Sequence, residues 1–126
     1  MRAIAPEGFI IGRSVHDPVE AGSIARDGAV DYLIFGTVFA TAFKPPGHPV
    51  GGLAALADAV AAARPIPVLA IGGIAVETAR NIRAVGAAGL AAIGLFLPGE
   101  AGETTLAETV RRLRDAFDTA ADLSEE

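Results

Sequence analysis

Four short apolar runs recur along the chain, and each of them ends in glycine and is followed by a helical pattern. The runs are residues 9–12, 32–36, 68–72 and 90–94. Each run is continuous rather than alternating, which is typical of a parallel strand buried on both faces. Strands that alternate with helices predict a parallel sheet with right-handed crossovers. The repeat therefore limits the chain to an α/β fold of four consecutive βα units.

Terminal signals mark the first predicted helix. Asp17 is placed as its N-cap, Pro18 takes the first helical position, and Glu20 follows three residues after the cap. Gly28 is the residue type that commonly ends a helix. The sequence therefore predicts a helix between the first two strands.

The other predicted helices have apolar stripes or end signals of their own. The third spans about 76–85 and stops at Gly86. Thr105 and Glu108 have the spacing of a capping box for the fourth. The stripes of the second and fourth helices are Leu53, Leu56, Ala57, Val60 and Ala61, and Leu106, Val110, Leu113 and Phe117.

Two architectures fit four βα units. One is a doubly wound open sheet, and the other is the C-terminal half of a (β/α)8 barrel. A complete barrel usually needs about 250 residues, and this chain has 126. A half barrel would leave one apolar sheet face that should pair with something. Either the chain lacks an N-terminal half or two copies associate, and the short lead-in before the first strand favours truncation.

The chain is expected to form one partial-barrel domain over residues 1–126, with a lead-in at 1–8 and an acidic tail at 119–126. Its formal charge of -5 argues against nucleic acid as a partner. No segment has the roughly 18 apolar residues of a membrane helix. The absence of cysteine excludes disulfides and thiolate metal sites, and it fits a cytoplasmic protein.

Functional residues of α/β folds lie at the carboxyl ends of the strands. Ser14 and His16 follow the first run, and a hydroxyl and an imidazole there could bind a phosphate oxygen or move a proton. The alternative is that they help to cap the first helix. The long loop at 37–52 holds Lys44, which could attract an anion or could be a solvated loop lysine. His48 is assigned to the loop without a role.

Glycine turns follow the third and fourth runs. Gly72 and Gly73 precede a helix, and Gly94 ends the last run. Bare backbone amides and a helix N-terminus can bind a phosphate group there. The alternative is that these glycines only terminate strands.

Three segments together resemble the thiamin-phosphate synthase/TenI family of (β/α)8 barrels. They are residues 12–16 (Gly-Arg-Ser-Val-His), residues 35–41 (Phe-Gly-Thr-Val-Phe-Ala-Thr) followed by Lys44, and residues 70–74 (Ala-Ile-Gly-Gly-Ile). The resemblance covers about residues 9–117 and implies strands five to eight of that barrel. It implies phosphorylated thiazole and pyrimidine substrates, and either synthase or thiazole tautomerase activity.

The resemblance also assigns individual residues. Ser14 and Lys44 match pyrophosphate-side positions of the synthase, and Thr41 matches a loop position beside the pyrimidine. His16 matches the acid/base of the tautomerase branch. The phosphate-cradling turns of the family match Gly73 and Gly94.

Two features separate the chain from a typical synthase. Phe43 stands where the synthase usually has threonine, and the sequence Arg-Ser-Val-His at 13–16 is closer to the tautomerase branch.

The magnesium carboxylates of the family belong to the first four units, so no magnesium site is assignable here, although magnesium is possible in a full-length synthase. The alternatives are therefore an enzyme domain acting on thiazole phosphate, a non-catalytic phosphate-ligand-binding or regulatory protein, and a half barrel that forms a homo-oligomer.

Overall fold

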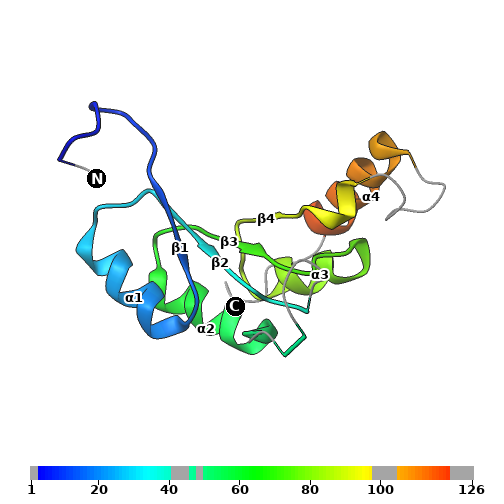
Figure 1. Ribbon diagram of the computed structural model, residues 1–126, viewed down its shortest axis with the longest axis horizontal. Coiled ribbons are helices and arrows are strands. Elements are labelled where there is room, and N and C mark those ends of the chain that lie inside the picture. Colours follow the sequence, from blue (N-terminus) through cyan, green and yellow to red (C-terminus); the bar gives the residue numbers. More distant parts are fainter. Residues whose placement is uncertain (1–2, 41–45, 48–49, 98–104, 120–126) are drawn as a thin grey trace.

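The computed structural model describes residues 3–40, 46–47, 50–97 and 105–119. Strands and helices alternate along this part of the chain (Figure 1). In order they are β1 (Gly12–Val15), α1 (Pro18–Asp27), β2 (Tyr32–Phe35), α2 (Gly52–Ala63), β3 (Val68–Ile71), α3 (Val76–Ala84), β4 (Gly89–Ala91), the 3₁₀ helix η1 (Gly94–Phe96) and α4 (Leu106–Asp118).

The four described strands form one parallel sheet in the order β1-β2-β3-β4. One row of register partners crosses the whole sheet, from Val15 through Phe35 and Ala70 to Leu90. Consecutive strands are always neighbours, as in a barrel, whereas a doubly wound sheet reverses its strand order. The predicted α/β fold of four βα units is therefore confirmed, and the doubly wound alternative does not apply to the described strands.

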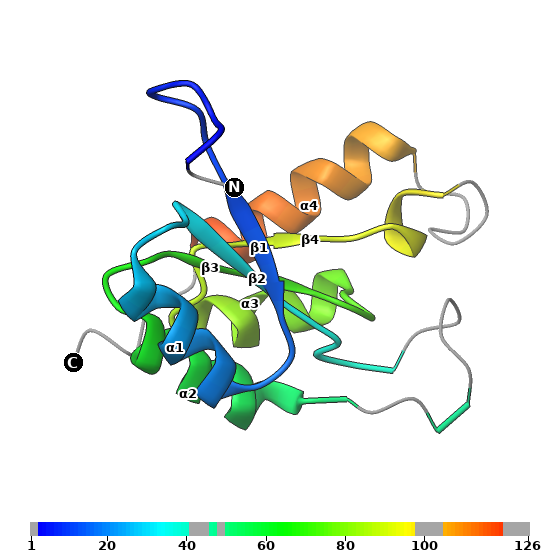
Figure 2. The same cartoon turned by 60° about the vertical axis from the view of Figure 1, so that its left-hand side comes forward.

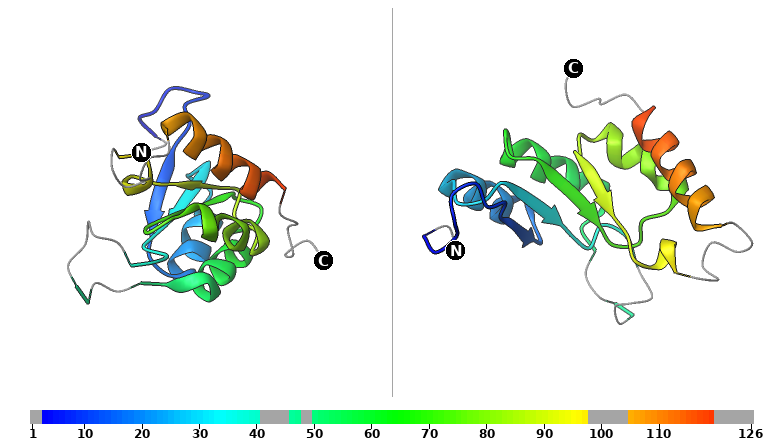
Figure 3. Two further views of the ribbon diagram at one scale, coloured as in Figure 1. Left: turned by 90° about the vertical axis from the view of Figure 1, so that its right-hand side faces the viewer. Right: turned by 90° about the horizontal axis from the view of Figure 1, so that it is seen from above.

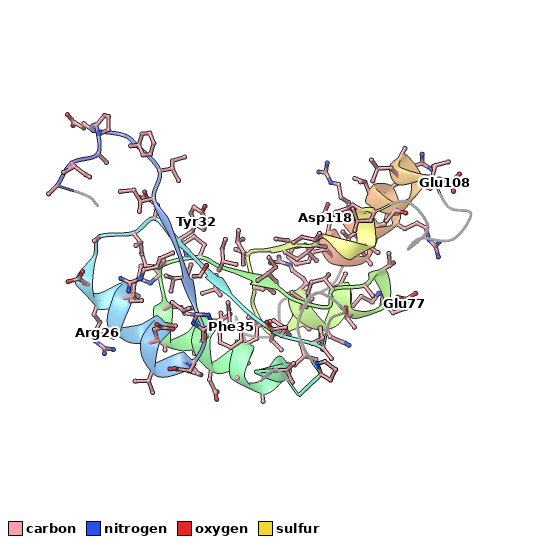
Figure 4. The ribbon with its side chains drawn as sticks, in the orientation of Figure 1. Arg26, Tyr32, Phe35, Glu77, Glu108 and Asp118 are labelled. Atoms are coloured by element: carbon pink, nitrogen blue, oxygen red, sulfur yellow. The ribbon has the colours of Figure 1, made fainter. Side chains whose placement is uncertain are left out.

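One face of the sheet holds the core. Leu33, Phe35, Val68 and Ala70 are buried there, and α1, α2 and α3 lie on this side (Figures 1 and 2). Phe35 points toward these helices while Tyr32 lies on the opposite side of the sheet (Figure 4).

The opposite face of the sheet is open in the described part of the chain. Side chains alternate between faces along a strand, so this face carries Tyr32, Ile34, Leu69 and Ile71, all of which remain half-buried. The open apolar face is the one that a half barrel was predicted to leave.

The predicted helix caps are observed. At α1, the Asp17 carboxylate accepts the backbone N–H of Glu20 at 2.8 Å, and Gly28 closes the helix in the left-handed conformation. At α4, the Thr105 hydroxyl accepts the N–H of Glu108 at 3.1 Å. These caps satisfy N–H groups that a helix start leaves without intrahelical partners.

The first strand begins three residues later than predicted. Phe9 and Ile10 are exposed, and the ladder starts where Gly12 pairs with Tyr32. The reason lies at Ile11: its N–H donates to the Asp31 carboxylate at 2.8 Å, so a side chain takes the place of a strand partner. Tyr32 also lies over Gly12, where a Cβ would come within 2.1 Å of the ring.

The last predicted strand is shifted as well. β4 begins at Gly89 and ends at Ala91, so Gly94 belongs to η1 rather than to the strand. The short 3₁₀ turn closes when Leu97 donates its N–H to the carbonyl of Gly94 at 3.1 Å.

Two helix stripes were predicted only in part. Leu56 and Val60 of α2 are buried, but Ala61 is exposed, because α2 packs on both the sheet and α1 and so buries Ala59 and Ala63 instead. The close approach of α1 is visible at Gly22, where a Cβ would lie 3.3 Å from Ala62 Cβ.

On α4, Leu113 is buried while Leu106 and Val110 are exposed. This helix packs chiefly on α3, where the Arg83 guanidinium lies 5.7 Å from the centre of the Phe117 ring. The apolar stripe of α4 is therefore wider than the surface that α3 covers.

Candidate functional site

The carboxyl ends of the four strands lie along one edge of the sheet, since the strands are parallel and in register. The strand arrows in Figure 3 (right) point toward this edge. In the chain, His16 follows β1, Gly72 follows β3, and Gly94 stands beyond β4 at the start of η1. With about 4.8 Å between neighbouring strands, β1 and β3 are roughly 10 Å apart. The structure thus brings the predicted acid/base and both predicted glycine turns to the same edge.

Ser14 lies inside β1 rather than in the turn after it, which corrects the sequence-based placement. It is exposed, and it alternates with buried Val15, so it faces the open side of the sheet. The cap of α1 is formed by Asp17. Within the described residues, neither the Ser14 hydroxyl nor the His16 imidazole accepts a helix N–H, so capping does not explain these two side chains.

His16 has a carboxylate partner one turn along α1. The backbone N–H of His16 donates to Glu20 Oε1 at 2.7 Å, and the Nδ1 atom of the ring lies 3.5 Å from the same oxygen. The sequence indicated Glu20 only as a helix-start residue. Its contact with the imidazole depends on a rotamer that spacing alone does not define.

The turn after β3 requires glycine for conformational and steric reasons. Gly72 and Gly73 have φ values of +108° and +65°, which side chains rarely adopt. A Cβ at Gly72 would lie 2.5 Å from Thr37 Cγ2, and one at Gly73 would lie 2.4 Å from the carbonyl oxygen of Ala40. Close packing of the turn against residues 37–40 therefore excludes larger residues.

Several amides of these turns have no hydrogen-bond acceptor among the described residues. Among the hydrogen bonds between described residues, none uses the N–H of Gly72, Gly73, Ile74 or Gly94 as donor. Gly73 is exposed. By contrast, Thr78 Oγ1 accepts the N–H of the N-cap Ala75 at 3.1 Å. Donors at this edge can therefore serve an anion.

The long β2–α2 connection starts and ends beside the glycine turn. Val38 and Phe39 donate their N–H groups to Ile71 and Gly72, each at 3.0 Å, and Gly52 donates to Val38 at 3.0 Å. Thr41, Lys44, Phe43 and His48 lie outside the described residues, so their predicted roles stay predictions. The described ends of the β2–α2 connection nevertheless show that it begins beside the glycine turn of the candidate site.

The described residues do not fit a magnesium site. They contain no group of three His, Asp or Glu side chains placed to hold a metal ion. Asp17 caps α1 and Asp31 accepts the N–H of Ile11, so both carboxylates already have structural partners.

Among the helices of the described residues, none is long and apolar enough to cross a membrane.

The solved structure of thiamine phosphate pyrophosphorylase from Pyrococcus furiosus is similar to this chain. The two share 33% identity with a TM-score of 0.71, and the match covers 93% of this chain but 52% of the other. A Bacteroides thetaiotaomicron thiamine phosphate pyrophosphorylase has a TM-score of 0.58 at 18% identity, which supports the fold alone. Both matches place the four βα units within a longer barrel-like chain.

Comparison of the sequence with curated proteins also finds relatives that are thiamine-phosphate synthases. The thiamine-phosphate synthase of Methanoculleus marisnigri is 39% identical over 94% of this chain and 54% of its own length. That of Methanocella arvoryzae is 46% identical over 79% of this chain and 46% of its own. The chain therefore spans about half the length of the curated relatives that it matches. The thiamine monophosphate synthase family model matches residues 1–96, and by these matches the chain belongs to that family, as its sequence motifs predicted.

Proposed function

We propose that this chain supplies the phosphate-binding turns and the acid/base of a thiamin-biosynthesis enzyme that acts on thiazole phosphate. The observation that supports this most strongly is the common edge shared by His16, the Gly72–Gly73 turn and Gly94. The proposal also draws on family membership, since the curated relatives are named thiamine-phosphate synthases.

In this proposal the phosphate dianion rests on the N–H groups of Gly73 and Gly94. The N-terminus of α3, which begins at Val76, adds the favourable end of the helix dipole. The thiazole ring would then extend across β2 toward β1. A ligand in this orientation would span the roughly 10 Å that separates β3 from β1.

His16 would move a proton on the bound ring. A neutral imidazole has one nitrogen that accepts a proton and one that carries a proton, so it can remove a proton from one ring atom and return it to another. In a tautomerase this transfer is the whole reaction, with no net change in atoms. In a synthase His16 would instead lie near the pyrophosphate of the pyrimidine substrate, together with Ser14 and Lys44, and Thr41 would lie beside the pyrimidine.

Magnesium, if a full-length synthase uses it, would be held by residues outside this half. Among the described carboxylates, Asp17 and Asp31 already accept backbone N–H groups. A cytoplasmic location belongs to the same proposal, and a homo-oligomer that covers the open sheet face is its alternative where no N-terminal half covers that face. The half-buried Ile34, Leu69 and Ile71 on that face support the second of these.

A non-catalytic phosphate-binding protein is the second candidate. It is favoured by Phe43, which stands where the synthase usually has threonine. Such a protein would keep the glycine turns and show no turnover. Phosphate binding at the turns is thus common to both candidates, and product formation separates them.

The test is a titration of the ¹⁵N-labelled chain with thiazole phosphate, followed by amide chemical shifts. The Gly73 and Gly94 signals should move in a saturable way. Gly28 is the matched control, because it also has positive φ but lies at the opposite end of the sheet, before β2. If Gly73 and Gly94 stay unmoved, or if Gly28 moves equally, the proposed phosphate site is wrong. Chromatography detects synthase product after a pyrimidine pyrophosphate is added, and tautomerase product when thiazole carboxylate phosphate is the ligand.

A further inference from the structure

We infer that Glu20 is a positioning residue for His16, which holds the imidazole proton on Nδ1 and leaves Nε2 as the proton acceptor. This inference rests on the proposed function for its catalytic meaning. The arrangement of the two side chains can be tested without turnover.

Glu20 is fixed at two points. Its backbone N–H donates to Asp17 Oδ1 at 2.8 Å, and its Oε1 atom accepts the backbone N–H of His16 at 2.7 Å. A capping box would direct this carboxylate to the N–H of the N-cap residue itself. Here the Glu20 carboxylate instead accepts the N–H of the residue before the N-cap. That residue is His16, the proposed acid/base.

The same oxygen lies 3.5 Å from His16 Nδ1. This separation is longer than an ordinary N–H···O hydrogen bond of about 2.9 Å, so the contact is mainly electrostatic. A carboxylate beside one ring nitrogen favours the tautomer with its proton on that nitrogen. The other nitrogen then presents a lone pair, which a general base needs.

The expected effect is modest because both side chains contact water. The His16 side chain is 76% exposed and that of Glu20 is 36% exposed. Exposed ion pairs usually change an equilibrium by about twofold to fivefold. The inference therefore predicts a biased tautomer ratio rather than a single locked tautomer.

The experiment measures the ¹⁵N shifts of the ring nitrogens in the neutral imidazole. The chain has two histidines, and His16→Asn identifies which signals belong to His16. Glu20→Ala should move the ratio by about twofold to fivefold toward the Nε2–H form. Glu20→Gln, which keeps an acceptor oxygen but removes the charge, should restore only a small part of the ratio, because the contact is mainly electrostatic. Thr105→Ala, which removes a comparable cap at α4, should leave it unchanged.

An unchanged ratio in Glu20→Ala would overturn the inference. If that variant does not fold, raising salt in the unmodified chain gives a second measurement, since screening weakens an exposed contact and should move the ratio in the same direction. A ratio insensitive to salt would count against Glu20. Where turnover is detectable, Glu20→Ala should lower kcat by a similar factor with KM unchanged. The ring measurement decides the role of Glu20 even if no reaction is found.

Discussion

Phe39 donates its backbone N–H to the carbonyl of Gly72 at 3.0 Å, which ties the start of the β2–α2 connection to the end of β3. A side chain at Gly73 would meet the carbonyl oxygen of Ala40 at 2.4 Å, in the same stretch of chain. These glycines are thus required by the packing of the loop before any ligand is considered. A substitution there should change both the folding and the site.

Gly73→Ala is expected to lower the free energy of unfolding by about 1–3 kcal/mol, because it adds a positive-φ penalty to a backbone clash. Gly28→Ala is the matched control, since Gly28 has φ +75° and open space around its Cβ position. That control should cost about 1–2 kcal/mol, from conformation alone. Urea unfolding measures both. Equal losses would show that the contact with residues 37–40 does not constrain Gly73.

The main elements of the fold could be predicted from the sequence because each has a local cause. The apolar runs at 32–36 and 68–72 contain β2 and β3, and the caps at Asp17 and Thr105 are observed. The start of β1 could not be predicted, since it depends on the Asp31 carboxylate, a residue twenty positions from Ile11.

The candidate site, like the fold, could be predicted from the sequence only in part. Parallel strands necessarily bring His16 and the glycine turns to one edge, so their common location follows from the repeat. The packing of residues 37–40 against Gly72 and the reach of Glu20 to His16 depend on three-dimensional contacts. Neither contact can be predicted from the spacing of the residues along the sequence.

Asp17→Ala should destabilise the chain by about 1 kcal/mol, the usual loss when an N-cap acceptor is removed. The bond that disappears joins Asp17 Oδ1 to the N–H of Glu20. Thr105→Ala removes the equivalent bond at α4 and should cost a similar amount. Thermal unfolding of the two variants makes the comparison. No loss in Asp17→Ala would mean that Glu20 is held by His16 alone.

Ile34→Asp should reduce self-association of the chain, since Ile34 lies on the open sheet face opposite the buried Leu33 and Phe35. A charge there opposes burial against a second copy. Val19→Asp is the control, because Val19 is 80% exposed on α1, away from that face. Sedimentation velocity should show fewer dimers in Ile34→Asp alone. A chain that is monomeric without any substitution would remove the homo-oligomer from the proposal.

His16→Asn should abolish isomerisation of a thiazole carboxylate phosphate and leave phosphate binding nearly intact. Asparagine is polar and of similar size but cannot exchange a proton near neutral pH, and loss of a general acid/base typically lowers turnover by about 10²–10⁴-fold. The binding turns at Gly73 and Gly94 follow other strands, β3 and β4, so the dissociation constant should change little. Proton exchange into the ligand in deuterated water, read by NMR, measures the reaction, and the amide shift of Gly73 measures binding in the same sample. Ser14→Ala, in the strand that precedes His16, separates loss of the imidazole from general disturbance of β1. Persistent exchange in His16→Asn would remove the acid/base role from His16, whereas loss of both exchange and binding would show that the substitution disturbs the whole edge of the sheet.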